Sequence, residues 1–309
     1  MQINKIGNYH IPAYTAKKAV NFGANNNEII PKDKYKDIFL DILINDYNAY
    51  LKPDSVLKAE TARIRQHLLT PITSREEYDR VLAKNLSLKH YPKESVLPKP
   101  FISTSGYENA DQELKGLVPY CGLEDKSDII NSFLSGRPLP TTVINEEQTA
   151  DIIRAMDYSL EKLDEKFGKY KGVVYRVGYF NPEQDKQFYS TSANSIGAVN
   201  HSIGYTPSEK EPYSIIKIKN GHNIYAFQKQ TNSYFSKRIA ETEREILTDR
   251  NSKFRLVPES EYTDTDIRLR NIMLTQALLK TDVINDRDIE NTVNSNKDLL
   301  QYINIWEEV

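Results

Sequence analysis

Three short segments in the second half of the chain carry residue types that can do chemistry. They are Arg176 in GVVYRVG, Ser190-Thr191-Ser192 in QFYSTSAN, and Glu243-Arg244-Glu245 in ETEREIL. The β-branched run around Arg176 predicts a buried strand, on which Arg176 lies on the face opposite Tyr175 and Val177. A guanidinium in such a strand needs an anion, and its planar fork of donors suits a phosphate at any working pH.

The two glutamates of the third segment indicate a charged site. Glu243 and Glu245 are two residues apart, so an extended backbone would direct both carboxylates to the same face. Ile246 and Leu247 would anchor that strand in the core. Two carboxylates held side by side repel each other, which favours a site that makes use of their charge.

Each segment also has a purely structural interpretation. A lone strand arginine is more often an ion-pair partner than a ligand-binding group. Glu241 and Glu243 could form the face of a solvated helix or loop, because 27% of the residues are charged. Ser-Thr-Ser is a weak signal, since a second copy at Ser103-Thr104-Ser105 has no arginine strand before it. The order, spacing and hydrophobic flanks of the three segments together favour the functional interpretation.

Together the segments resemble the arginine, serine, glutamate class of mono-ADP-ribosyltransferases, which includes bacterial toxins, secreted effectors and phage-encoded modifiers of host proteins. That family has an aromatic-Arg strand start, a Ser-Thr-Ser strand and a Glu-x-Glu strand, matched by Tyr175-Arg176, Ser190-Thr191-Ser192 and Glu243-Arg244-Glu245. The resemblance covers about residues 105–275. It includes SDIINSFLSGRPL, NEEQTADIIRAMDYSLEKLDEKF and the hairpin EREILTDRNSKFRLV.

The resemblance implies transfer of ADP-ribose from NAD, a substrate here, to a protein side chain in a host cell, with release of nicotinamide. It assigns catalysis to Arg176, Ser190, Glu243 and Glu245, and NAD binding to Arg176, Ser190, Thr191, Ser192 and Glu245. Glu245 would stabilise an oxocarbenium-like state, and Ser190 would orient it. Arg176 would hold the NAD phosphates, while Thr191 and Ser192 would support the strand and the pocket.

Target choice follows from positions around the Glu-x-Glu pattern. Glu243 would contact the acceptor, and glutamate at this position is typical of members that modify arginine. The family often has an aromatic residue just before Glu-x-Glu that recognises the target, for which the nearest residues are Tyr234 and Phe235. Tyr205 is the candidate for stacking near the nicotinamide. Two alternatives stay open: an NAD glycohydrolase with water as acceptor, and an inactive binding module that keeps the fold.

Composition fits a two-part enzyme. The length of 309 residues predicts about two domains, and a net charge of -2 gives no support for a nucleic-acid surface. No stretch reaches the about 20 apolar residues of a membrane span, and the opening MQINKIGNYHIP lacks the apolar core of a signal peptide. We therefore expect a soluble protein, and the resemblance implies that it is secreted by a non-classical route and active in the host cytoplasm.

Cysteine, histidine and glycine usage argues against other kinds of site. Cys121 is the single cysteine, which excludes an intramolecular disulfide, and we interpret it as a spectator. The five histidines show no paired ligand spacing, so no metal is predicted. No glycine-rich loop opens a helix after a strand, so NAD would be bound by a fold other than the doubly wound one.

The elements that must position these segments are predicted to form an α+β fold. Residues 1–100 would be a helical region, with helices over 33–51 and 55–69 and a third opened by a capping box between Ser74 and Glu77. This region would either stabilise the enzyme as a packing extension or bind a target or secretion partner. The proline-rich stretch 90–100 would link it to the rest.

Residues 101–309 would be the catalytic domain, with two packed, mainly antiparallel sheets around an NAD cleft by family expectation. A helix is predicted over 146–167 from its apolar stripe. Strands are predicted over 173–178, 187–192, 213–219, 223–228, 243–247 and 253–257. The last stretch, 285–309, is predicted as a helical extension that packs on the core or closes over it.

Overall fold

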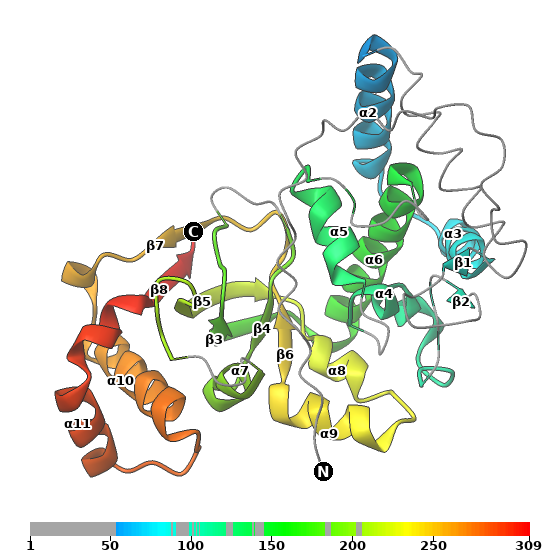
Figure 1. Cartoon of the computed structure of the whole chain (residues 1–309). Coiled ribbons are helices and arrows are strands. Elements are labelled where there is room, and N and C mark those ends of the chain that lie inside the picture. The colour runs from blue at the N-terminus through cyan, green and yellow to red at the C-terminus, as the bar shows by residue number, and fades with distance from the viewer. Residues whose placement is uncertain are drawn as a thin grey trace, which may run out of the picture.

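The computed structural model describes residues 54–87, 89–90, 99–100, 102, 104, 106–121, 126–137, 139, 145–182, 187–201 and 206–309. Within these residues a helical part, α2 to α6, lies beside a sheet that is flanked by α7 and by α10 and α11 (Figure 1). The predicted helix over 33–51, the residues Ser103 and Ser105, and Tyr205 lie outside the described residues.

The helices begin and end as follows: α2 Asp54–Leu68, α3 Arg75–Ser87, α4 Val118–Cys121, α5 Ser127–Leu134, α6 Glu146–Phe167, α7 Ser195–His201, α8 Ile224–Gln228, α9 Tyr234–Glu243, α10 Asp264–Leu279 and α11 Asp286–Ser295. Three 3₁₀ turns are η1 Gln112–Leu117, η2 Glu259–Glu261 and η3 Lys297–Tyr302. None of the helices in the described ranges is long and apolar enough to cross a membrane.

Helix α6 is the centre of the helical part. Its N-terminus is closed by a capping box between Asn145 and Gln148, and one face of it is buried against α2, α3 and η1. The capping contact predicted for α3 is present, because Glu77 N donates to Ser74 Oγ at 3.1 Å. The helices predicted over 55–69, from Ser74 and over 146–167 are therefore confirmed.

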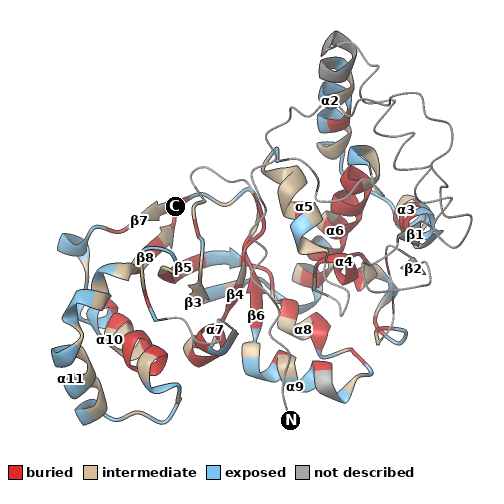
Figure 2. Cartoon of the chain, viewed as in Figure 1, coloured by how far each residue is buried: buried red, intermediate tan, exposed pale blue. Residues whose placement is uncertain are grey.

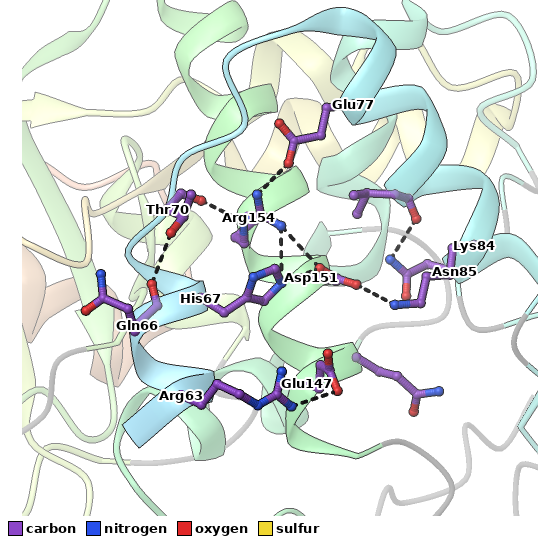
Figure 3. A network of polar contacts seen from close by, with 12 residues as sticks. Arg63, Gln66, His67, Thr70, Glu77, Lys84, Asn85, Glu147, Asp151 and Arg154 are labelled. Carbon is purple, nitrogen blue, oxygen red and sulfur yellow. Dashed lines mark hydrogen bonds and ion pairs between the residues drawn. The ribbon is translucent and has the colours of Figure 1, made fainter. Parts of the chain in front are cut away.

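A polar network joins α2 and α3 to α6 within this core (Figure 3). Arg154 of α6 donates to Glu77 Oε1 at 2.6 Å and to Thr70 O at 2.6 Å. Asp151, one turn earlier, accepts from Lys84 Nζ at 2.8 Å and lies 2.8 Å from His67 Nε2. Burial acts to raise the pKa of Asp151, but the bonds from Lys84 and His67 outweigh it and hold that pKa below its usual value.

The predicted linker over 90–100 has paired ends. Strand β1 (Lys89–His90) pairs antiparallel with β2 (Lys99–Pro100). The described helices of the N-terminal region share one hydrophobic cluster with α6, which contains Tyr78 and Leu82 of α3 together with Ile152 of α6. The domain boundary near residue 100 stays a prediction, and so does a partner for residues 1–100.

The described strands of the second half form one six-stranded sheet in the order β6-β4-β3-β5-β8-β7. Their bounds are β3 Tyr170–Val177, β4 Ser190–Ser192, β5 Tyr213–Gly221, β6 Glu245–Leu247, β7 Phe254–Leu256 and β8 Ile303–Glu308. All neighbours are antiparallel except β5 and β8, which are parallel. The fold is thus a mixture of helices and strands as expected, but its strands join one mixed sheet instead of two packed sheets.

The sheet buries both of its faces. One face carries Tyr175 and Ile215 and packs on Met273 of α10, while the other carries Val174, Ile216 and Trp306. Buried residues accordingly gather in α6, in β4, β5, β6 and β8, and on the inner side of α10 (Figure 2). In contrast, no residue of α11 is buried.

Two predicted elements differ in type from the observed ones. Residues 223–228 form helix α8 instead of a strand, because the side chain of Asn223 caps it by accepting from Ala226 N. The stretch 285–309 is a helix only as far as Ser295. It ends in β8, where Ile303 and Ile305 alternate inward and pair with β5.

Candidate active site

The carboxylate of Glu245 is buried at the start of β6, with 7% of the residue exposed. Ser190 Oγ of β4 donates to its Oε1 at 2.6 Å. Gln228 Nε2, from the last residue of α8, donates to its Oε2 at 2.5 Å. Donors on both oxygens favour the charged form of a carboxylate and restrict its rotation.

The three hydroxyls of Ser190-Thr191-Ser192 have different partners. Antiparallel pairing places Ser192 opposite Glu245 and Ser190 opposite Leu247, so Ser190 reaches the carboxylate across a diagonal. Thr191 Oγ1 donates to Ile246 O at 2.6 Å on the buried face. Ser192 Oγ bonds to the carbonyl of Glu243. Thr191 and Ser192 therefore fix the backbone of the Glu-x-Glu segment, and their contact with NAD stays a prediction.

The predicted strand over 243–247 is broken in the middle. Glu243 is the last residue of α9, Arg244 adopts the left-handed conformation with φ of 47°, and β6 begins only at Glu245. Ser233 starts α9 by accepting from Ser236 N. Glu241 and Glu243 therefore lie on a helix, as in the structural interpretation of this segment. Glu243 and Glu245 nevertheless line one cavity, because the turn at Arg244 brings them to the same wall.

Glycine is required where α7 passes the end of α9. A Cβ on Gly197 would lie 2.7 Å from Thr242 O and 2.8 Å from Ser192 Oγ. Real Cβ atoms do not approach backbone that closely, so this close packing depends on glycine. This contact packs α7 against the Glu-x-Glu turn, whose backbone is also held by the hydrogen bond of Ser192.

Arg176 lies on the predicted face of β3, opposite Tyr175 and Val177. Its Nη1 donates to Ser190 O at 2.6 Å and its Nε to Tyr179 O at 2.9 Å. The guanidinium also lies 5.4 Å from the centre of the Tyr189 ring. Burial lowers the pKa of Arg176 below its usual value, although arginine stays protonated. Among the described residues, no carboxylate forms an ion pair with Arg176, and its contact with the NAD phosphates stays a prediction.

A cavity of about 410 Å³ opens beside these groups. Arg176, Ser190, Glu243 and Glu245 all line it, together with residues from helices α4, α5, α8 and α9: Tyr120, Cys121, Ser127, Asp128, Asn131, Gln228, Ser236, Ile239 and Ala240. Tyr107 closes one side and stacks on Phe227 with ring centres 4.7 Å apart. Burial, with a smaller contribution from the negative charge of Glu245, raises the pKa of Tyr107 and keeps its phenol neutral.

The cysteine, histidine and aromatic residues discussed in the sequence analysis make no contact with Glu245 among the hydrogen bonds described above. Cys121 is half-buried on the cavity wall, and its Sγ donates to Leu117 O at 3.1 Å. His222 is buried with Nδ1 3.0 Å from Asp164 Oδ2. No group of three metal-binding side chains occurs in the part of the chain that the structure describes. Tyr234, one of the aromatic residues nearest to Glu-x-Glu, is 80% exposed at the start of α9, at the opposite end of that helix from Glu243.

Sequence reasoning missed Gln228 and Tyr107 as wall residues of the site. The segment that ends at Gln228 is predicted as a strand, and that prediction gives no reason to place the side chain of Gln228 near Glu245. Asn223 followed by an aliphatic residue is an N-cap signal that could have indicated the helix. Tyr107 offers no comparable signal, because only the tertiary fold brings it to the cavity.

No family model matches the chain, and no curated protein matches it in sequence. Solved structures similar to it include that of the type III effector XopAI from Xanthomonas axonopodis pv. citri. The two sequences are 12% identical, the match covers 83% of this chain and 100% of XopAI, and the TM-score is 0.43. Another is the ADP-ribosyltransferase HopU1 of Pseudomonas syringae pv. Tomato DC3000, with 10% identity, coverage of 78% and 100%, and a TM-score of 0.38. TM-scores below 0.5 at such identity do not establish a common fold.

Proposed function

We propose that the chain is an NAD-dependent mono-ADP-ribosyltransferase that modifies arginine side chains of a protein. The observation that carries the proposal is the restraint on Glu245. A buried carboxylate bonded at both oxygens stands on the wall of a cavity large enough for part of a dinucleotide. Fixed negative charge of this kind stabilises a cation that develops beside it.

The residues present fit NAD as a substrate. Arg176 is a partly buried cation that donates to two carbonyl oxygens, so a phosphate oxygen would supply the negative charge that its surroundings lack. It lines the same cavity as Glu245. A molecule with a phosphate at one end and an electron-poor glycosidic bond at the other would satisfy both groups.

In the proposed reaction, the bond between the ribose C1′ and the nicotinamide nitrogen breaks, and its electron pair leaves with nicotinamide. Positive charge then develops on the ribose ring, and Glu245 stabilises it without forming a bond. A guanidine nitrogen of the acceptor attacks C1′ and afterwards loses a proton. The products are nicotinamide, the ADP-ribosylated side chain and one proton.

Glu243 supports an arginine acceptor. It is the last residue of α9 and lines the same cavity as Glu245. A carboxylate at that point can bind a guanidinium in the bidentate manner that this pair favours. Action on a host protein and export from a bacterium follow from the sequence resemblance and stay predictions.

The test is incubation with labelled NAD and a cell lysate, with both protein-bound label and free nicotinamide measured. The variant Glu245→Gln keeps the size of the side chain and removes its charge. The control Glu241→Gln makes the same change at an exposed position of α9. We expect discrete labelled bands for the wild type and the control, and at least 100-fold less product for Glu245→Gln.

Other outcomes have distinct meanings. Nicotinamide release without labelled protein would assign the chain as an NAD glycohydrolase. Absence of both signals in every variant would contradict the proposal and favour an inactive binding module. Equal labelling by the wild type and Glu245→Gln would show that the site lies elsewhere.

A further inference from the structure

The second oxygen of Glu245 is held by a residue that the sequence pattern does not contain. Ser190 occupies Oε1, and Gln228 Nε2 occupies Oε2 at 2.5 Å. Gln228 is 9% exposed and is the last residue of α8. We propose that Gln228 is a positioning residue for the reaction, acting through Glu245; the inference rests on the proposed function.

Local structure holds Gln228 at a fixed place relative to β6. His222 N donates to Leu247 O at 2.8 Å and Leu247 N to His222 O at 3.0 Å, so the chain just before α8 is paired to the strand of Glu245. Ile224 and Phe227 are fully buried, which fixes α8 on its other side. The donor is thus set in place before any substrate arrives, as electrostatic stabilisation requires.

The orientation of the Gln228 amide is decided by the charge of its partner. An ionised carboxylate only accepts hydrogen bonds, so the amide NH₂ must face Glu245. The amide carbonyl, Oε1, then points away, and it is buried without a hydrogen-bond partner among the described residues. An unpaired buried acceptor destabilises a fold, so glutamine is a poor choice for stability at this position. Its presence is explained by the bond to Glu245.

This reasoning separates positioning from a merely structural role. Methionine has nearly the shape of glutamine, so Gln228→Met keeps the packing of α8. The change removes the unpaired carbonyl of Gln228 but also takes a donor away from the buried Oε2 of Glu245, and these two effects oppose each other in the stability of the fold. Because Glu245 loses the donor from Gln228, catalysis should fall. A residue needed only for packing would show the opposite pattern.

Gln230 provides a matched control two residues away. Its Oε1 accepts from Asp111 N at 2.9 Å and its Nε2 donates to Asp111 Oδ2 at 3.2 Å. It does not line the cavity of Glu245. Gln230→Met therefore deletes an amide from the same segment without touching the site.

The experiment measures nicotinamide release and thermal unfolding for the wild type, Gln228→Met and Gln230→Met. We expect kcat of Gln228→Met to fall about 10- to 100-fold, as for loss of a hydrogen bond to a charged group, with less than a two-fold change in KM for NAD. Its Tm should stay close to that of the wild type. Unchanged kcat in Gln228→Met, or an equal fall of kcat in Gln230→Met, would overturn the proposal.

A second variant tests the electrostatic side. Gln228→Glu places a carboxylate against Glu245, and two such groups share a proton. In a plot of kcat against pH, the fall of kcat on the acidic side should therefore occur at a pH higher by about one unit or more. The other ionisable groups that line the cavity are unchanged in this variant: Tyr120, Cys121, Asp128, Arg176, Glu243 and, on its edge, Tyr107. A profile that keeps its wild-type limb would count against the proposal.

Failure of the proposed function is recognised in the same experiment, because the wild type would then release no nicotinamide. The positioning role is in that case decided by crystal structures of the wild type and Gln228→Met. Rotation of the Glu245 carboxylate away from Ser190 in the variant would uphold the role. An identical carboxylate in both structures would reject it.

Discussion

Ser190 and Glu245 meet across a diagonal of two antiparallel strands, and Ser190 Oγ donates to Glu245 Oε1 at 2.6 Å. The residue directly opposite Glu245 is Ser192, whose hydroxyl instead holds the carbonyl of Glu243. One strand thereby fixes the side chain of the second glutamate and the backbone of the first. Ser190 and Ser192 are two residues apart on β4 and so point to the same face, which makes both contacts possible at once.

The first prediction concerns Ser190→Ala. Removal of the hydroxyl deletes one donor to a buried carboxylate, so we expect nicotinamide release to fall about 10- to 100-fold while the fold is retained. The comparison is Thr191→Val, which deletes the bond to Ile246 O and should lower Tm more than activity. Equal kcat in Ser190→Ala and the wild type would show that this bond does not matter for the reaction.

The second prediction concerns Arg176→Lys. Lysine keeps the charge but cannot reproduce the two directed bonds to Ser190 O and Tyr179 O while also facing a phosphate. We expect the dissociation constant for NAD, measured by calorimetry, to rise at least ten-fold. The control Arg268→Lys changes an arginine whose side chain is 68% exposed and should bind NAD as the wild type does.

Parts of this site could be predicted from the sequence because they depend on local pattern. The stripe of α6 and the β-branched run of β3 repeat over enough residues to determine the element and its buried face. The turn at Arg244 could not be predicted, because a non-glycine residue in the left-handed region has no reliable local signal. Helix α8 was missed since five residues are too few to show helical periodicity.

The C-terminal strand was missed for a different reason. Strand β8 is stabilised by parallel pairing with β5, which lies about ninety residues earlier in the chain. Its isoleucines alternate over too short a stretch to outweigh the helical pattern of α11 just before it. Long-range pairing of this kind is a tertiary property, and it decides where the predicted C-terminal helix stops.

The third prediction concerns the network between α3 and α6. Arg154 is 4% exposed and bonds to Glu77, Thr70 and Asp151. Arg154→Met leaves the buried Asp151 and the partly buried Glu77 with less compensation, so we expect a loss of about 3–5 kcal/mol in the free energy of unfolding by urea. The control Arg63→Met breaks an exposed pair with Glu147 and should cost less than about 1 kcal/mol. Similar losses for the two variants would contradict the assignment of the network as buried.

The fourth prediction concerns acid stability and Glu308 of β8. Its carboxylate accepts from Ser252 Oγ at 2.6 Å, Asn220 Nδ2 at 2.9 Å and Asn220 N at 2.9 Å, and also from Lys219 N. Burial acts to raise the pKa of Glu308, but these bonds outweigh it and lower that pKa below its usual 4.5. Because the folded pKa is the lower one, the stabilisation is complete above pH 4.5 and is lost as pH falls through the folded value.

The measurement for Glu308 is urea unfolding at several pH values between neutral and acid for the wild type and Glu308→Gln. The wild type should lose stability more steeply than the variant below the usual glutamate pKa. Parallel curves for the two proteins would show that Glu308 does not contribute to the acid transition. The exposed residue Glu290 provides the control, since Glu290→Gln should lose stability on acidification as steeply as the wild type does.

The fifth prediction separates the two glutamates of the Glu-x-Glu segment. Glu243 ends α9 and Glu245 begins β6, so the two carboxylates belong to different elements and can be changed independently. Glu243→Gln removes the charge proposed to bind the acceptor guanidinium and leaves the bonds of Ser190 and Gln228 to Glu245 in place. We therefore expect protein labelling to fall at least ten-fold more than nicotinamide release. Equal losses of both would place Glu243 in the cleavage step, and unchanged labelling would remove it from acceptor binding.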